Sequence, residues 1–95
     1  MRPIYTIAEE IYKLWRKPNG QSNVWYGAVP YLEAMSFLDK TTDTYFDDTA
    51  KSVVVYFISN AATWRGEDAR RIKNELRQMF SLPIPKEKNA KADSN

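Results

Sequence analysis

Two residue types that carry much of protein chemistry are missing, because the 95-residue sequence contains no cysteine and no histidine. Without cysteine there is no disulfide, thiol nucleophile or thiolate metal ligand, so nothing suggests an oxidising compartment. Without histidine the chain lacks the commonest general base and metal ligand, which excludes histidine-dependent triads. Glu9, Glu10 and Glu33 could act as acid and base, but the sequence gives no reason for them to meet. We therefore expect no enzyme, no metal and no cofactor.

Long apolar runs are missing as well. The longest is VVVYFI at residues 53–58, far shorter than the roughly 20 residues of a membrane-spanning helix. The N-terminal stretch MRPIYTIAEEIYK has acids where a signal peptide has its apolar region. These features predict a cytoplasmic protein that has no membrane partner.

Positive charge is in short supply too. A net charge of +2 is weak for a protein that lives on nucleic acid, unless the charge is concentrated. Two basic and five acidic residues lie between positions 25 and 64, whereas the segments on both sides are mildly basic. Apolar material is plentiful, since 43% of the residues are hydrophobic and 14% are aromatic. A chain of this length forms one domain with a sizeable core and needs no disulfides.

Helical periodicity begins near the N-terminus. Apolar residues recur at helical intervals over residues 7–16, namely Ile7, Ile11, Leu14 and Trp15. Thr6 and Glu9 have the spacing of a capping box, which predicts the start of this helix. The segment KPNGQSN then ends the helix, because proline cannot continue it and Asn-Gly favours a turn.

A second helix is expected around Pro30, which fits the first helical turn. Its apolar positions are Leu32, Met35 and Leu38. The polar segment at residues 40–48 reads as a loop, and Asp47 or Asp48 could cap the next helix. A calcium loop is the alternative for the aspartates here, but the required spacing, glycine and distal glutamate are absent.

The third helix is predicted from a wide apolar stripe. Its members are Ala50, Val53, Val54, Phe57, Ile58, Ala61 and Trp64. Because SVVVYFI is rich in β-branched and aromatic residues, a buried strand is the competing interpretation. Helix is favoured because the pattern is longer than a typical strand and no second strand is available to pair with it.

Gly66 separates the third helix from a fourth. The apolar face of that helix consists of Ala69, Ile72, Leu76, Met79 and Phe80. The last residues carry two prolines and no periodicity. The sequence therefore predicts an all-α, compact four-helix single domain over residues 1–82, followed by a disordered polar tail over residues 83–95.

Positive charge is concentrated on the fourth helix. On a helical wheel Arg70, Lys73 and Arg77 fall on one flank of the apolar face, and the acids Asp68 and Glu75 fall on the other. Arg71 points away from the core and can pair with Glu67, one turn away. A solvated helix whose long side chains cover the edge of the core explains this pattern. A docking edge for phosphates or for an acidic protein surface explains it as well.

Part of this region also resembles a helix-turn-helix. Ala62 and Gly66 have the right separation, and Arg70, Lys73, Asn74 and Arg77 would lie on the exposed side of a recognition helix. However, Arg65, Glu67 and Glu75 occupy positions where that pattern requires apolar residues. The acids at the start of the helix would also face phosphate.

Aromatic residues gather in NVWYGAVPYL, where Trp25, Tyr26 and Tyr31 surround a glycine and a proline. Aromatic side chains with a polar group are typical anchors of protein interfaces. They are equally typical of a loop that closes a small core. We keep these three residues as a second candidate surface.

Two segments, YGAVPYLEAM at residues 26–35 and AKSVVVYFISNAATWRGEDARRIKNEL at residues 50–76, resemble short proteins encoded by bacteriophages and prophages. In that group an AVPYLxAM segment precedes a YFLxNAxxWRGxxARRIKxEL segment, and the likeness covers roughly residues 26–77. The resemblance brings no known activity or catalytic residue with it. It implies a viral accessory protein, which often acts by stoichiometric binding. Such proteins block a host enzyme or a defence complex, as anti-CRISPR proteins do, or adjust transcription.

We accordingly expect a small non-enzymatic protein that binds and modulates or inhibits a host protein or nucleoprotein complex in the host cytoplasm. The alternative is a small helix-turn-helix-like regulator that binds DNA. The third possibility is a virion or assembly component, which would form a homo-oligomer. The candidate contact residues are Arg65, Arg70, Arg71, Lys73, Asn74 and Arg77, with Trp25, Tyr26 and Tyr31 as the second surface.

Overall fold

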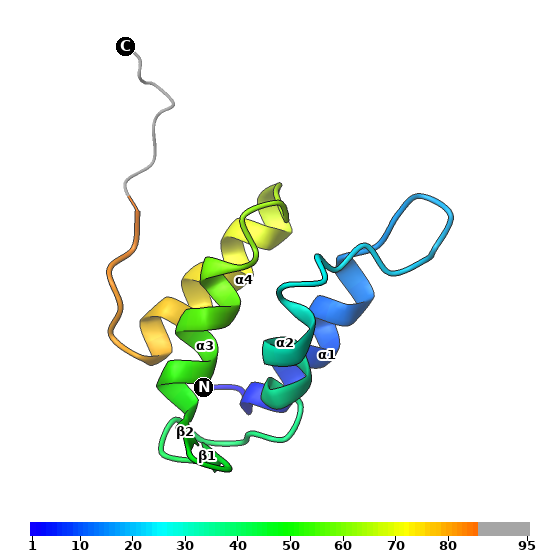
Figure 1. Ribbon diagram of the computed structural model, residues 1–95. Helices are drawn as coiled ribbons and strands as arrows, with labels where there is room; N and C mark the ends of the chain where they lie inside the picture. Colours follow the sequence, from blue (N-terminus) through cyan, green and yellow to red (C-terminus); the bar gives the residue numbers. More distant parts are fainter. Residues whose placement is uncertain (86–95) are drawn as a thin grey trace.

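A computed structural model describes residues 1–85 of the chain and has four helices and one short hairpin within them (Figure 1). In chain order the elements are α1 (Ile4–Leu14), α2 (Val29–Met35), β1 (Thr44–Tyr45), β2 (Asp48–Thr49), α3 (Ala50–Ser59) and α4 (Glu67–Met79). The prediction of a compact four-helix domain is confirmed, but a purely all-α class is wrong because of the hairpin. Of the predicted disordered tail, residues 83–85 belong to no helix or strand, and residues 86–95 lie outside the described part.

The first helix begins at Ile4 rather than Ile7, and Pro3 precedes it as the N-cap. The predicted capping box is therefore wrong, since Thr6 lies inside the helix and no side chain caps its start. Backbone contacts take over this role, because the N–H groups of Ile4 and Tyr5 donate to the carbonyls of residues 39 and 38 at 3.0 and 2.8 Å. The segment that follows α2 thus satisfies amides at the start of α1, which a local pattern cannot reveal.

The segment that was expected to be a plain polar loop forms the hairpin instead. Thr44 pairs with Thr49, and Tyr45 pairs with Asp48, in an antiparallel register. Because Asp48 is part of β2, the predicted aspartate cap is wrong. Thr49 caps α3 in its place, and its hydroxyl accepts a hydrogen bond from the Ser52 N–H at 3.1 Å. The expected placement of Pro30 in the first turn of α2 is confirmed.

The apolar run at residues 53–58 is helical, so the alternative of a buried strand is excluded. The helix α3 ends at Ser59, which places Ala61 and Trp64 in the connection that leads to α4. Both side chains are nevertheless buried, so the predicted stripe continues into the core beyond the end of the helix.

The core lies between the four helices and is closed by two stacked tryptophans. The rings of Trp15 and Trp64 are 5.3 Å apart and nearly parallel, at 13°. Phe57 meets the Trp15 ring edge-on at 6.3 Å. The largest fully buried side chains come from every helix, namely Ile4, Ile7, Ile11, Leu32, Met35, Val54, Phe57, Ile72 and Leu76, with Leu38 just after α2.

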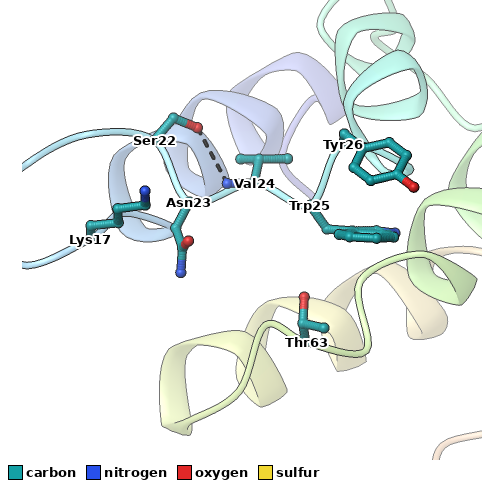
Figure 2. Close-up of a pocket in the computed structure, with 7 residues that line it drawn as sticks. All are labelled: Lys17, Ser22, Asn23, Val24, Trp25, Tyr26 and Thr63. Carbon is teal, nitrogen blue, oxygen red and sulfur yellow. Dashed lines mark hydrogen bonds between the residues drawn. The ribbon is translucent and has the colours of Figure 1, made fainter.

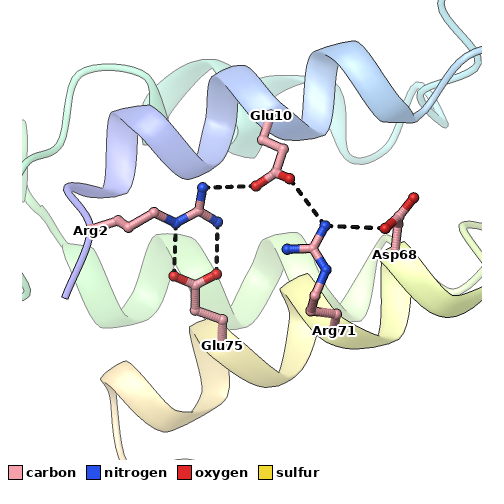
Figure 3. A network of polar contacts seen from close by, with 5 residues as sticks. All are labelled: Arg2, Glu10, Asp68, Arg71 and Glu75. Atoms are coloured by element: carbon pink, nitrogen blue, oxygen red, sulfur yellow. Dashed lines mark hydrogen bonds and ion pairs between the residues drawn. The ribbon is translucent and has the colours of Figure 1, made fainter.

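Ion pairs join the N-terminal segment and α1 to α4 (Figure 3). The Arg2 guanidinium donates two hydrogen bonds to Glu75, at 3.0 and 2.7 Å. Glu10 lies between two arginines and contacts Arg2 at 2.8 Å and Arg71 at 3.0 Å. Arg71 also contacts Asp68 at 3.1 Å. A network of this kind holds the two helices in register more than any single surface pair would.

The network predicts a loss of stability in acid. Hydrogen bonds from Arg71, and the charge of Arg2, keep the pKa of Glu10 below its ordinary value. A carboxyl with a lowered folded pKa contributes stability above its unfolded pKa and loses that contribution as pH falls through the folded pKa. We expect Glu10→Gln to lower the free energy of unfolding by about 1–2 kcal/mol at pH 7. This difference should shrink below about pH 4.

Urea unfolding at a series of pH values measures this effect. The matched control is Glu9→Gln, because Glu9 is the exposed neighbour outside the network. An equal effect of the two substitutions, or a Glu10→Gln effect that does not change with pH, would contradict the assignment.

Candidate binding surface

Four of the predicted cations line one shallow hollow beside α4. The residues around this hollow, which we call the basic hollow, are Ala62, Trp64, Arg65, Gly66, Ala69, Arg70, Lys73 and Arg77. Its volume is about 360 Å³, and none of its lining residues is acidic. The wheel predicted that three of these cations share a flank of the helix, and the structure adds Arg65 to them. Four of the 14 lysines and arginines of the chain thus gather at one place.

Glycine at position 66 makes this arrangement possible. Gly66 precedes α4 as its N-cap, with φ 109° and ψ 179°, a region that is essentially restricted to glycine. This conformation turns the chain from the connection into the helix. The small residues Ala62 and Ala69 keep the hollow open, and Trp64 closes its inner side.

Gly66→Ala should therefore lower the free energy of unfolding by about 1–2 kcal/mol through backbone strain alone. No atom lies within 4 Å of the position that the new Cβ would take, so a steric clash is not the cause. Chemical unfolding measures the loss. Gly20→Ala is the matched control, because Gly20 has φ 90° in an exposed turn, also with open space around it. Gly20→Ala should lose comparable stability, because it strains a positive-φ position outside the lining of the basic hollow. Unchanged stability in Gly66→Ala would contradict the assignment of backbone strain at Gly66.

Lys73 is only partly available to a partner. Its ammonium donates to the carbonyls of Ala61 and Trp64, at 2.6 and 2.7 Å, and lies 5.9 Å from the centre of the Trp64 ring. Burial, together with the charges of Arg77 and Arg65, lowers the pKa of Lys73. The side chain therefore ties α4 to the connection, while its charge remains at the edge of the hollow.

The other predicted contact residues of α4 divide into two groups. Arg77 stays at the hollow and donates to the Asn74 side chain at 2.8 Å, so Asn74 orients an arginine. Arg71 lies away from the hollow, in the ion network with α1. The predicted pair of Arg71 with Glu67 is replaced by pairs with Glu10 and Asp68, because tertiary packing brings Glu10 within reach.

The second candidate surface is also divided. Tyr31 stacks on Tyr56 of α3, with ring centres 5.4 Å apart, and packs against the core. Trp25 and Tyr26 remain together at the surface, with ring centres 4.1 Å apart and exposed fractions of 41% and 76%. They line a hollow of about 430 Å³, the aromatic hollow, whose other members are Lys17, Ser22, Asn23, Val24 and Thr63 (Figure 2).

A glycine also positions the exposed tryptophan. A Cβ at Gly27 would lie 2.6 Å from Trp25 Nε1 and 3.0 Å from Asn60 Oδ1. The Asn60 amide in turn donates to the Tyr56 carbonyl at 2.9 Å, at the end of α3. Because position 27 has no side chain, the indole can lie close to the end of α3 instead of moving freely in solvent.

Sequence reasoning missed one exposed aromatic cluster. Phe46 at the tip of the hairpin is 86% exposed and has φ 55°, and Phe37 is 74% exposed. Tyr45 contacts both rings, at centre distances of 4.7 and 5.8 Å. No local signal announces this cluster, since a positive φ is usually marked by glycine or asparagine.

Residues 1–85 contain neither a cluster of metal ligands nor a membrane-spanning helix. No three carboxylate side chains in this range lie close enough to hold a metal ion. Asp43 instead closes its loop, because its carboxylate accepts from the backbone N–H groups of Asp39 and Lys40, which lowers the Asp43 pKa. None of the described helices is long and apolar enough to cross a membrane.

No protein-family model, curated protein or solved structure matches this chain at a significant level.

Proposed function

We propose that this is a small non-enzymatic accessory protein of phage type, which binds and modulates or inhibits a host protein or nucleoprotein complex in the host cytoplasm. Inhibitors of host defence, of the anti-CRISPR type, are an example of this class. The observation that supports the proposal most is the basic hollow, where Arg65, Lys73 and Arg77 lie together and no lining residue is acidic. Like charges held together in this way favour an anionic partner.

The alternative of a helix-turn-helix regulator gains no support from the geometry. The connection between α3 and α4 runs from residue 60 to residue 66, whereas a helix-turn-helix has a turn of three or four residues. Lys73, which would belong to the exposed side of a recognition helix, donates inward to the connection.

The third possibility, a virion or assembly component, has one observation in its favour. The exposed rings of Phe37 and Phe46 form an apolar tip of the kind that mediates association. A closed oligomer at micromolar concentration would support that role. A sedimentation experiment that finds only monomer would remove it.

The main proposal is tested by capture from a bacterial host lysate with the tagged protein. Arg65→Glu combined with Arg70→Glu reverses two exposed charges of the basic hollow and leaves the inward bonds of Lys73 in place. We expect this variant to retain less than a tenth of the partner that the wild type retains, and we expect wild-type capture to weaken as salt rises.

The matched control is Lys13→Glu combined with Lys51→Glu, which makes the same change of net charge at exposed positions outside the hollow. It should capture as much partner as the wild type. Equal capture by all three proteins would mean that the basic hollow is not the contact surface.

A further inference from the structure

We propose that the basic hollow and the aromatic hollow together bind a single-stranded stretch of nucleic acid. Unpaired bases would stack on Trp25 and Tyr26, and the phosphates would lie over Arg65 and Arg77. This inference rests on the proposed function and specifies the chemistry of the partner.

The two hollows lie on either side of one short backbone segment. Thr63 lines the aromatic hollow, and its chain neighbours Ala62 and Trp64 line the basic hollow. In Figure 2, Thr63 faces the segment that carries Trp25 and Tyr26 across the aromatic hollow. A flexible ligand that passes over Thr63 would therefore touch both hollows at once.

The charged residues that line the two hollows are all basic, and Glu67 and Asp68 line a separate hollow that shares Arg70 with the basic one. Lys17 lines the aromatic hollow, Arg65, Lys73 and Arg77 line the basic hollow, and neither lining contains a carboxylate. The charges of Arg65 and Arg77 also lower the Lys73 pKa after the effect of burial, which places the three groups within electrostatic reach of one another. Neutralising phosphates would relieve this mutual repulsion. The small net charge of the whole chain does not reveal this local excess of positive charge at the two hollows.

The aromatic pair determines the class of ligand. An acidic peptide would need the cations and has no particular use for two exposed rings, whereas every base has a face that can stack on them. A duplex hides its base faces, so a single strand fits the pair better. Gly27 allows the Trp25 ring to lie close to Asn60, which places the ring before a ligand arrives. A positive groove combined with aromatic platforms is the usual design for single-strand binding.

Trp25 also provides a direct signal. Of the three tryptophans, Trp15 and Trp64 are 3% and 6% exposed, and Trp25 is 41% exposed. Base stacking should therefore quench the fluorescence of Trp25 and leave that of the two buried rings nearly unchanged. The probes are fluorescein-labelled oligothymidylate and oligouridylate of about 12 nucleotides, within the range of single-strand sites. A DNA duplex of the same length serves as the comparison.

We expect anisotropy titrations to give saturable, salt-sensitive binding of at least one single strand, weaker binding of the duplex, and quenching of tryptophan fluorescence. Trp25→Ala should weaken the affinity about tenfold, because it removes the ring on which one base stacks. Arg65→Glu with Arg70→Glu should weaken it further and lower the dependence on salt. The control Phe37→Ala removes an exposed ring outside both hollows and should bind like the wild type.

The inference is overturned if neither strand binds, if Trp25→Ala binds as well as the wild type, or if the duplex binds equally well. Lysate capture after nuclease treatment separates this failure from a failure of the proposed function. If a host protein is still captured by the wild type after nuclease treatment and is lost in the Arg65/Arg70 variant, the proposed function stands although the single-strand site is wrong.

Discussion

Trp64→Ala should lower the free energy of unfolding by about 3–5 kcal/mol, the range for truncating a buried aromatic side chain. Trp64 is 6% exposed although it lies outside any helix, in the connection between α3 and α4. Its ring stacks on Trp15, and the Lys73 ammonium lies over it. Truncation would open a cavity beside Trp15 and remove a ring contact that itself contributes about 0.5–1.5 kcal/mol.

Urea unfolding followed by far-ultraviolet circular dichroism measures this loss. Trp25→Ala is the matched control, because it makes the same chemical change at a ring that is 41% exposed and should cost no more than about 1 kcal/mol. If the two substitutions cost the same, the Trp15–Trp64 stack does not hold the core together. A loss that appears only in Trp64→Ala would also identify the connection as part of the folded core.

Apolar periodicity is the reason that the helices could be predicted. The stripes of α3 and α4 repeat at the helical interval over ten residues or more, and packing then follows the pattern. The predicted helix boundaries were wrong where residues distant in the sequence determine them. The start of α1 depends on backbone carbonyls beyond α2, and the start of α3 depends on a hairpin that has no glycine at its turn. A positive φ at Phe46 has no sequence signature.

The candidate surface was predictable to the extent that it lies on one helix. The wheel places Arg70, Lys73 and Arg77 together because they share a face of α4, and the structure keeps them together. Two features of the surface could be recognised only from the tertiary structure. The close approach of Glu10 to Arg71 links two helices, and the inward turn of Lys73 depends on where the connection places its carbonyls. Neither contact has a sequence spacing that a helical wheel could detect.

Lys73→Met should lower the free energy of unfolding by about 1–3 kcal/mol. The substitution keeps a long apolar stem and removes the ammonium, so the Trp64 carbonyl loses its donor and the Ala61 carbonyl keeps only the bond from the Trp64 N–H. A partly buried acceptor that is left without a partner costs about 1–3 kcal/mol. The cation above the Trp64 ring is lost as well. Arg70→Met is the control, because Arg70 is exposed one turn earlier on α4, and it should cost no more than about 1 kcal/mol.

The pH dependence of the stability difference between wild type and Lys73→Met gives a second, independent check. Burial, then the charges of Arg77 and Arg65, lower the Lys73 pKa, so the unfolded chain binds the Lys73 proton more tightly than the folded one does. Between the two pKa values the unfolded state holds more protons, and stability from this group therefore rises with pH, just below about pH 10.4. A neutral amine still donates to both carbonyls, so the bonds persist through the titration. The difference in stability between wild type and Lys73→Met should grow in this alkaline window. Two small and equal effects, with no change toward alkaline pH, would instead mean that Lys73 is free at the surface and available to a partner.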